Sequence, residues 1–290
     1  MGANHHGSEI RPMHAKCFLS AILAALCGAP LAYADEECKV PSDDCVAIGR
    51  WNFSVALGAG VRTNPLANGT DIPLVVIPEF SYYWKRFFVD NLDLGFTLAE
   101  SGTNTFNLIA TPGYDRVYFY RTDLQNFFIG FPTNASAPVL VSSTAPGAVK
   151  VSPPTPHVTY LGGPEWTFKV GRVSGQLDLL RDLTGQNNGD EIRAAVGIPL
   201  IESRGSMSAN AGFTWKSAAT VNYYYWVSRL NNGGSALNPF LKLGYTLPLT
   251  GKWRFTAFVE YEKLGNAIAA SPIVAENHVE TAFVGAVYSF

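Results

Sequence analysis

The chain has 290 residues, of which 47% are hydrophobic and 13% aromatic, whereas only 15% are charged and the formal net charge is −2. Soluble domains carry roughly 25% charged residues. A nucleic-acid-binding protein would show a basic excess, which is absent here. Beyond residue 34, no segment offers the run of about 18 apolar residues that a membrane helix needs. The apolar residues must therefore fill a core or face lipid on a β-barrel.

The N-terminus has the features of a secretory signal peptide. Lys16 precedes an apolar stretch over 18–32, and the stretch ends in an A-x-A cleavage site at Ala34. We therefore expect residues 1–34 to be a signal peptide. Met13 is its expected natural start, which makes 1–12 a mis-called extension.

Residues 35–50 are expected to form a periplasmic tail. The tail contains Cys38 and Cys45, which are separated by six residues. In an oxidising periplasm such a pair is expected to form a disulfide that closes a small turn. A metal site is disfavoured, because neither His157 nor His278 has a neighbour at ligand spacing.

Alternation with a period of two residues recurs along the chain, whereas helical periodicity does not. From Trp51 to Val61, apolar side chains at odd positions alternate with small or polar residues at even positions. The same pattern returns over 160–170, 206–215 and 241–249. Segments of about ten residues match the length of a tilted strand that crosses a bilayer.

The polar faces of these segments separate a membrane barrel from a soluble sandwich. A sandwich would show many Lys and Glu residues on its outer face, but Gly, Ser, Ala and Asn predominate here. Small residues with a few charges suit a barrel lumen, with large apolar residues facing lipid. The charges expected in the lumen are Glu79, Asp93, Glu165, Asp178, Arg193, Arg254 and Glu260.

The connections between segments alternate in length. Short ones lie at 84–86, 171–172, 202–205 and 250–252, and longer ones at 62–71, 115–157, 183–189, 217–235 and 264–277. Short periplasmic turns and long external loops are typical of outer-membrane barrels. At the predicted periplasmic strand ends, Trp51, Trp84 and Trp253 are expected to form an aromatic girdle.

The strand count follows from parity. If the C-terminus is periplasmic, the barrel can begin in the periplasm only if 86–99 is a hairpin that turns near Asn91. With that hairpin, residues 51–290 are predicted to form one all-β antiparallel transmembrane barrel of about 12 strands, with both termini periplasmic and a long external loop at 115–157. The last strand ends in Phe290, which resembles the signal that the barrel-assembly machinery of Gram-negative bacteria reads.

The C-terminal third carries a motif. Tyr261, Glu262 and Leu264 are followed by Ser271, Pro272, Ile273 and Val274. This run resembles the MipA/OmpV family of outer-membrane proteins, in which a Y-E-[RK]-L…S-P-I-V pattern marks the last external loop. The resemblance implies a scaffold in the outer membrane that links a lytic transglycosylase to a bifunctional penicillin-binding murein synthase. Other members are described as adhesion or stress-related porin-like proteins.

No catalytic constellation is visible, and we expect no cofactor and no enzyme activity. His157 and His278 lack the orienting partners of a catalytic base. Asp178 with Asp182, and Glu260 with Glu262, are interpreted as charge ladders in the lumen. The run Tyr223–Trp226 is expected either to contact lipopolysaccharide or a partner, or to belong to an interface girdle.

Three hypotheses follow. The first is a non-enzymatic scaffold, whose partners are outer-membrane lipid and lipopolysaccharide, the barrel-assembly machinery, the lytic transglycosylase and the murein synthase. The second is a small-solute channel, and the third is a lipid-modifying enzyme that uses one of the two histidines. An open or a filled lumen distinguishes the first from the second.

Overall fold

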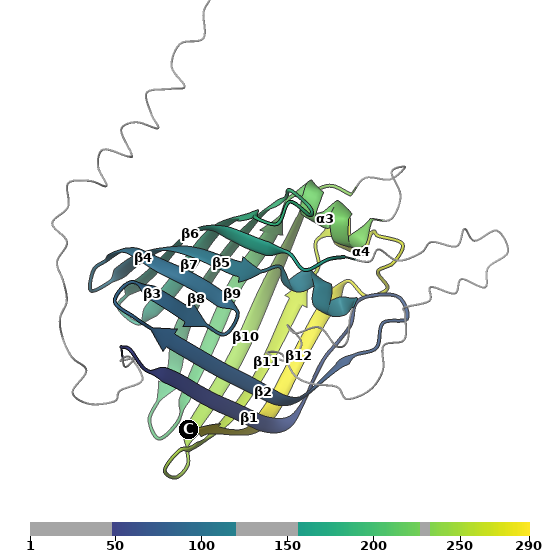
Figure 1. The fold of residues 1–290 in the computed structure, drawn as a ribbon. Helices are drawn as coiled ribbons and strands as arrows, with labels where there is room; N and C mark the ends of the chain where they lie inside the picture. Colours follow the sequence, from purple (N-terminus) through teal and green to yellow (C-terminus); the bar gives the residue numbers. More distant parts are fainter. Residues whose placement is uncertain (1–47, 120–155, 227–232) are drawn as a thin grey trace, which may run out of the picture. The chain divides into compact units, whose positions relative to one another are not determined.

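The computed structural model describes residues 48–119, 156–226 and 233–290. They form twelve antiparallel strands in a closed barrel (Figure 1). Each strand pairs with its neighbours in sequence, and the first pairs with the last, so no strand edge is left at the seam. The predicted twelve-stranded barrel is confirmed.

The strands run in chain order around the wall. They are β1 (Trp51–Arg62), β2 (Ile72–Tyr83), β3 (Phe87–Asp90), β4 (Asp93–Glu100), β5 (Asn104–Pro112), β6 (Tyr160–Val170), β7 (Val173–Asp182), β8 (Asp190–Glu202), β9 (Ser206–Lys216), β10 (Ala236–Pro248), β11 (Trp253–Lys263) and β12 (His278–Ser289). Three short helices lie in the described parts of the connections: η1 (Tyr114–Tyr118), α3 (Ala218–Tyr225) and α4 (Asn266–Ala269). Among the described helices, none is long and apolar enough to span a membrane.

The predicted hairpin over 86–99 is confirmed as β3 and β4. Asn91 supplies its turn with a φ of 52°, a left-handed conformation that Asn tolerates better than most residues. The side chain of Asn91 accepts a hydrogen bond from the backbone N–H of Phe80 at 3.0 Å, which fixes the hairpin to β2. With this hairpin the barrel has an even number of strands, so β1 begins and β12 ends at the same end of the barrel.

The two ends of the barrel differ, and we name them by their connections. The turn end carries the short turns, and there β1 begins and β12 ends, with Ser54 opposite Ser289. The loop end carries η1, α3 and α4. The two ends correspond to the predicted short and long connections.

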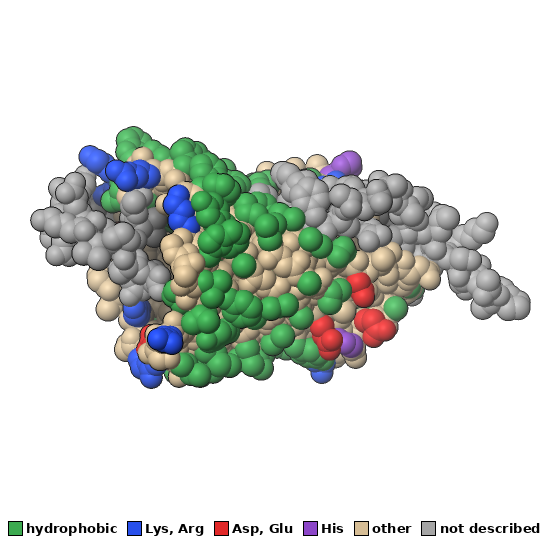
Figure 2. Space-filling view, turned by 90° about the horizontal axis from the view of Figure 1, so that it is seen from below, with side chains coloured by type: hydrophobic (Ala, Val, Ile, Leu, Met, Phe, Trp, Pro, Cys, Tyr) green, Lys and Arg blue, Asp and Glu red, His purple; other side chains and the backbone are tan. Residues whose placement is uncertain are grey.

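The outer surface of the wall is apolar, as the alternation predicts. Outward-facing side chains such as Phe53, Leu57, Leu108 and Leu241 are about half exposed. Figure 2 shows hydrophobic side chains in a broad band across this face, with most of the visible Lys and Arg at one end and most of the visible Asp, Glu and His at the other. An apolar band of this size on a single chain is a lipid-facing surface.

At the seam, Phe283 of β12 points inward and packs against glycines of β1. A Cβ atom on Gly60 would lie 2.9 Å from a ring carbon of Phe283, and one on Gly58 would lie 2.7 Å away. Because Gly58 and Gly60 have no side chain, the large ring of Phe283 can lie against the inner wall. There it belongs to the buried apolar cluster of the lumen.

Candidate functional site

The loop end of the lumen is filled by a plug, which we define as η1, α3, α4 and residues 270–274. These segments come from three connections and meet at one end of the barrel (Figure 1). Their apolar side chains share one buried cluster with the inner wall; its members include Val117, Tyr118, Val221, Tyr224, Tyr225, Ile268 and Ile273 of the plug and Ile72, Leu74, Val279 and Phe283 of the wall. The main core of the protein thus lies inside the lumen.

Local sequence explains why α3 starts where it does. Ser217 is its N-cap, and the Ser217 hydroxyl accepts from the backbone N–H of Thr220 at 3.5 Å. The same hydroxyl accepts from the backbone N–H of Asp190 at 2.9 Å. Ser217 therefore caps the start of the helix and also binds the first residue of β8.

The end of α3 is capped by the motif loop. Ser271 donates its hydroxyl hydrogen to the carbonyl oxygen of Tyr225, the last residue of the helix. Carbonyls in the last turn of a helix have no partner within the helix, so this bond satisfies a buried acceptor. It also joins two segments of the plug.

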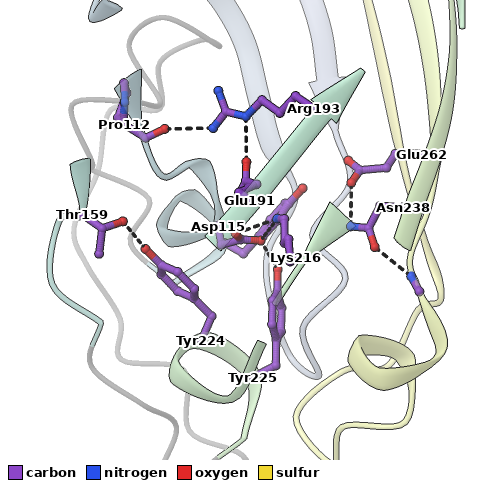
Figure 3. A network of polar contacts seen from close by, with 12 residues as sticks. Pro112, Asp115, Thr159, Glu191, Arg193, Lys216, Tyr224, Tyr225, Asn238 and Glu262 are labelled. Atoms are coloured by element: carbon purple, nitrogen blue, oxygen red, sulfur yellow. Dashed lines mark hydrogen bonds and ion pairs between the residues drawn. The ribbon is translucent and has the colours of Figure 1, made fainter. Parts of the chain in front are cut away.

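A buried ionic network attaches the plug to the wall (Figure 3). The Lys216 ammonium donates to both carboxylate oxygens of Asp115 at 2.6 Å, and the Tyr225 hydroxyl donates to one of them at 2.6 Å. Asp115 is 3% exposed and Lys216 is 7% exposed. Charges are kept in such sites only when they are paired and hydrogen-bonded. The network therefore fixes η1 and α3 to the end of β9.

A second network holds η1 to the opposite part of the wall. Arg62 donates to the Tyr118 hydroxyl at 2.7 Å and lies 3.8 Å from the Glu262 carboxylate. Glu262 also accepts from the amide of Asn238 at 2.9 Å, and Asn238 in turn accepts from the backbone N–H of Gly265 at 2.8 Å. Arg62, Asn238 and Glu262 thereby join strands β1, β10 and β11 directly, and the Tyr118 hydroxyl attaches η1 to them.

Arg193 completes the polar contacts of this region. Its guanidinium donates to Glu191 at 2.7 Å and to the carbonyl of Pro112 at 3.4 Å (Figure 3). Tyr224 and Thr159 share a hydrogen bond of 2.7 Å between their hydroxyls. The start of η1 and the beginning of β6 are therefore both attached to neighbouring elements.

Burial changes the acidity of the plug tyrosines. It raises the pKa of Tyr118 to about 12, with nearby Arg62 opposing the shift. Burial likewise raises the pKa of Tyr114 to about 12. Burial and the Asp115 carboxylate together hold the pKa of Tyr225 well above its ordinary range. These hydroxyls therefore stay protonated and neutral at every physiological pH.

Below the plug, the lumen holds a cavity that charged, polar and apolar side chains line together. A cavity of about 1470 Å³ extends from inner-wall residues such as Arg62 and Thr281 to the turns at 203–205 and 251–252. Arg254 forms an ion pair with Glu79 at 3.0 Å, and Lys242 forms one with Glu260 at 3.5 Å. Four of the charges predicted for the lumen wall, Glu79, Arg254, Glu260 and Arg193, thus take part in cross-strand pairs or in the plug networks.

The described part of the chain shows no preassembled metal site. No group of three His, Cys, Asp or Glu residues there lies close enough to hold a metal ion. The His278 ring stacks on Tyr261 and lies 3.7 Å from Glu280. The backbone N–H of His157 donates to the Tyr223 hydroxyl, which places this residue at the edge of the plug.

The remaining predicted residues lie as follows. Trp51, Trp84 and Trp253 are 52%, 60% and 41% exposed at the turn end. Phe290 is 71% exposed, and its backbone N–H donates to the carbonyl of Phe53. Cys38, Cys45, the predicted signal peptide and residues 120–155 of the predicted long loop lie outside the described residues. The girdle, the disulfide and the assembly signal stay predictions.

Two interpretations were wrong. Tyr224 and Tyr225 do not form an exposed contact surface or a girdle, because both are 1% exposed within the plug. Asp182 does not extend a luminal ladder from Asp178. It accepts hydrogen bonds from the backbone N–H groups of Thr184, Asn187 and Asn188, so it closes the turn after β7.

The family motif builds the plug instead of an outward-facing loop. Leu264, Ser271 and Ile273 are at most 3% exposed, and Glu262 belongs to the Arg62 network. Val274 forms a bridge with Leu66. The signal that could have revealed this is the apolar character of the loop. An Ile–Val pair that faced water would not gain the free energy that burial of its side chains provides.

Among solved structures, the chain is similar to the outer-membrane protein OmpT of Vibrio cholerae, with 10% identity, 83% of this chain and 97% of that chain covered, and a TM-score of 0.31. It is also similar to an anion-selective porin from Comamonas acidovorans, with 9% identity, 83% and 99% of the two chains covered, and a TM-score of 0.33. No curated protein matches the chain in sequence.

The family comparison covers almost all of the barrel. The family model described as MltA-interacting protein MipA matches residues 55–290, a range that includes every motif residue from Tyr261 to Val274. The resemblance inferred from these residues is therefore confirmed, and the chain belongs to the MltA-interacting protein MipA family.

Proposed function

We propose that this protein is a non-enzymatic, non-conducting outer-membrane barrel that serves as a scaffold for murein-remodelling enzymes, with its turn end in the periplasm. The family name refers to interaction with MltA, and the apolar outer band supports a membrane location. The observation that carries the proposal is the plug. A lumen filled at the loop end suits a platform that presents one face and not a path for solutes.

The partners proposed for the turn end are the lytic transglycosylase MltA and a bifunctional murein synthase. Short turns favour this end as a docking face, because they hold their side chains in fixed positions close to the membrane surface. The purified barrel, immobilised through an added tag, is expected to retain MltA from solution. If MltA is not retained by a barrel that migrates as folded protein, the scaffold proposal fails.

A channel is the alternative, and the cavity of about 1470 Å³ below the plug, which Arg254 and Glu79 help to line, favours it. Planar-bilayer recordings separate the two. We expect the wild-type barrel to give no conductance steps, and the Tyr224→Ala/Tyr225→Ala variant to give them because it removes two buried rings of the plug. Steps from the wild-type protein would contradict a closed scaffold. Conductance of the variant alone would show that insertion occurred and that the plug blocks the lumen.

A further inference from the structure

Three tryptophans at the turn end each adjoin a cationic residue in sequence. The pairs are Arg50–Trp51, Trp84–Lys85 and Lys252–Trp253. They lie at the start of β1, in the turn after β2 and in the turn before β11. Three separate turns thus repeat the same combination of an amphipathic ring and a positive charge.

These residues occupy one continuous sector of the wall. Trp253 lies 5.0 Å from Tyr288, and Tyr288 lies 5.0 Å from Phe290, measured between ring centroids. On the other side, Trp51 lies 4.9 Å from Tyr82. Because β11, β12, β1 and β2 are neighbours in the barrel, the rings form an aromatic belt across this sector. We call this sector the belt.

The cations of the belt are exposed and carry no acidic partner in the described part of the chain. Arg50, Lys85 and Lys252 are exposed, and the Lys252 ammonium lies 5.9 Å above the Tyr288 ring. By contrast, Arg172 in another turn is paired with Glu202 at 3.0 Å. The belt therefore presents uncompensated positive charge beside rings that face lipid.

The depth at which the belt lies in the membrane indicates which part of a lipid its cations contact. Exposed Trp rings of membrane proteins lie at the boundary between acyl chains and headgroups. A Lys or Arg that follows or precedes such a ring reaches the level of the lipid phosphates, where each cation near an anionic surface contributes about 1 kcal/mol. We propose that the belt binds anionic phospholipid headgroups, with Lys85 and Lys252 contacting the phosphate and the rings contacting the acyl chains. The inference depends on the proposed function in one respect: the proposed orientation of the barrel decides in which leaflet of the membrane the belt lies.

The test uses the tryptophans of the belt as reporters. The barrel is folded into phosphatidylcholine vesicles that contain either brominated phosphatidylglycerol or brominated phosphatidylcholine at the same mole fraction. Bromine quenches Trp fluorescence on contact, so the ratio of the two quenching constants reports lipid preference. We expect the wild-type ratio to favour phosphatidylglycerol several-fold, and high salt to lower the ratio.

The Lys85→Gln/Lys252→Gln variant is expected to lose most of this preference, so that its ratio of quenching constants approaches one. The matched control is Arg172→Gln/Arg204→Gln, which removes the same charge from turns without a tryptophan and should keep the wild-type ratio. Both variants are checked for folding by heat-modifiable migration on gels. An equal ratio for the wild type, or the same loss in the control, would overturn the proposal.

A third outcome distinguishes lipid from protein. If the vesicles show no preference while Lys85→Gln/Lys252→Gln loses MltA binding, the belt contacts a partner and the lipid proposal is wrong. If MltA does not bind but the preference for phosphatidylglycerol persists, the scaffold proposal fails and the lipid site stands. The quenching assay contains no partner protein, so the two results are independent.

Discussion

Individual residues decide whether the plug stays in place. Lys216 is the last residue of β9, and its ammonium is buried because the plug covers it. Its charge is tolerated only because the Asp115 carboxylate accepts from it at 2.6 Å. Removing one member of such a pair leaves the other charge buried without compensation.

We therefore predict that Lys216→Met destabilises the folded barrel by about 3–5 kcal/mol, because Asp115 is left as an unpaired buried anion. The measurement is urea unfolding of the barrel in detergent, followed by tryptophan fluorescence. Lys263→Met is the matched control, since Lys263 is the last residue of β11 but is exposed. The double variant Asp115→Leu/Lys216→Met should recover much of the loss. No difference between Lys216→Met and Lys263→Met would contradict the assignment.

Ser271 belongs to the family motif and caps α3. Ser271→Ala leaves the buried Tyr225 carbonyl without this donor, and such a loss costs about 1–3 kcal/mol. The same urea unfolding measures it, with Ser203→Ala in an exposed turn as control. A motif serine that acted only in partner binding would leave stability unchanged.

The elements of the plug are short, and their position depends on tyrosine hydroxyls. The Tyr118 hydroxyl of η1 accepts from Arg62, whereas the Tyr225 hydroxyl of α3 donates to Asp115. Burial raises the pKa of Tyr118 to about 12. Raised phenol pKa values link the stability of the plug to pH.

The sign follows from the neutral form being favoured in the folded state. The unfolded tyrosine ionises near pH 10, and the folded Tyr118 only near about pH 12. The stabilisation is therefore complete below about pH 10 and is lost as the pH rises towards 12. The ultraviolet absorbance of tyrosinate should show that the plug tyrosines ionise at a higher pH than free tyrosine. Bilayer conductance, recorded over the same pH range, should appear as they ionise. Titration of all tyrosines near pH 10 in the folded barrel would exclude this behaviour.

At the scale of the whole molecule, the two ends of the barrel differ in the balance of their exposed charges. The turns of the described barrel carry Arg50, Lys85, Arg86, Arg172, Arg204 and Lys252. At the loop end, Asp71, Glu276 and Glu280 are exposed. Figure 2 shows this segregation on one face of the barrel. Orientation in the membrane thus decides which charge meets the periplasm.

We predict that the loop end faces outside. Ala275→Cys at the loop end should react with a membrane-impermeant maleimide on intact cells, whereas Ser203→Cys in a turn should react only after the outer membrane is permeabilised; both residues are exposed. The background is a chain in which Cys38 and Cys45 are replaced by Ser. Labelling of Ser203→Cys alone on intact cells would reverse the proposed topology and the assignment of the belt to the periplasmic leaflet.

The amino-acid sequence by itself determined the wall. Side chains in a strand alternate with a period of two, so lipid on one side and a polar lumen on the other leave a pattern that is readable without coordinates. Asn91 and the parity argument even located the short hairpin. The exposure of the Trp51 and Trp253 side chains follows from the same alternation.

The plug was decided only by tertiary structure. Asp115 meets Lys216 and Tyr225 across 101 and 110 residues of sequence, and no periodicity records such a contact. The Tyr223–Trp226 run and the Ser271–Val274 loop were expected at the surface, because loops are normally polar and solvated. Tyr224, Tyr225 and Ile273 of these segments are buried because a wide barrel leaves space that its wall residues do not fill, and apolar loop residues gain free energy by filling it.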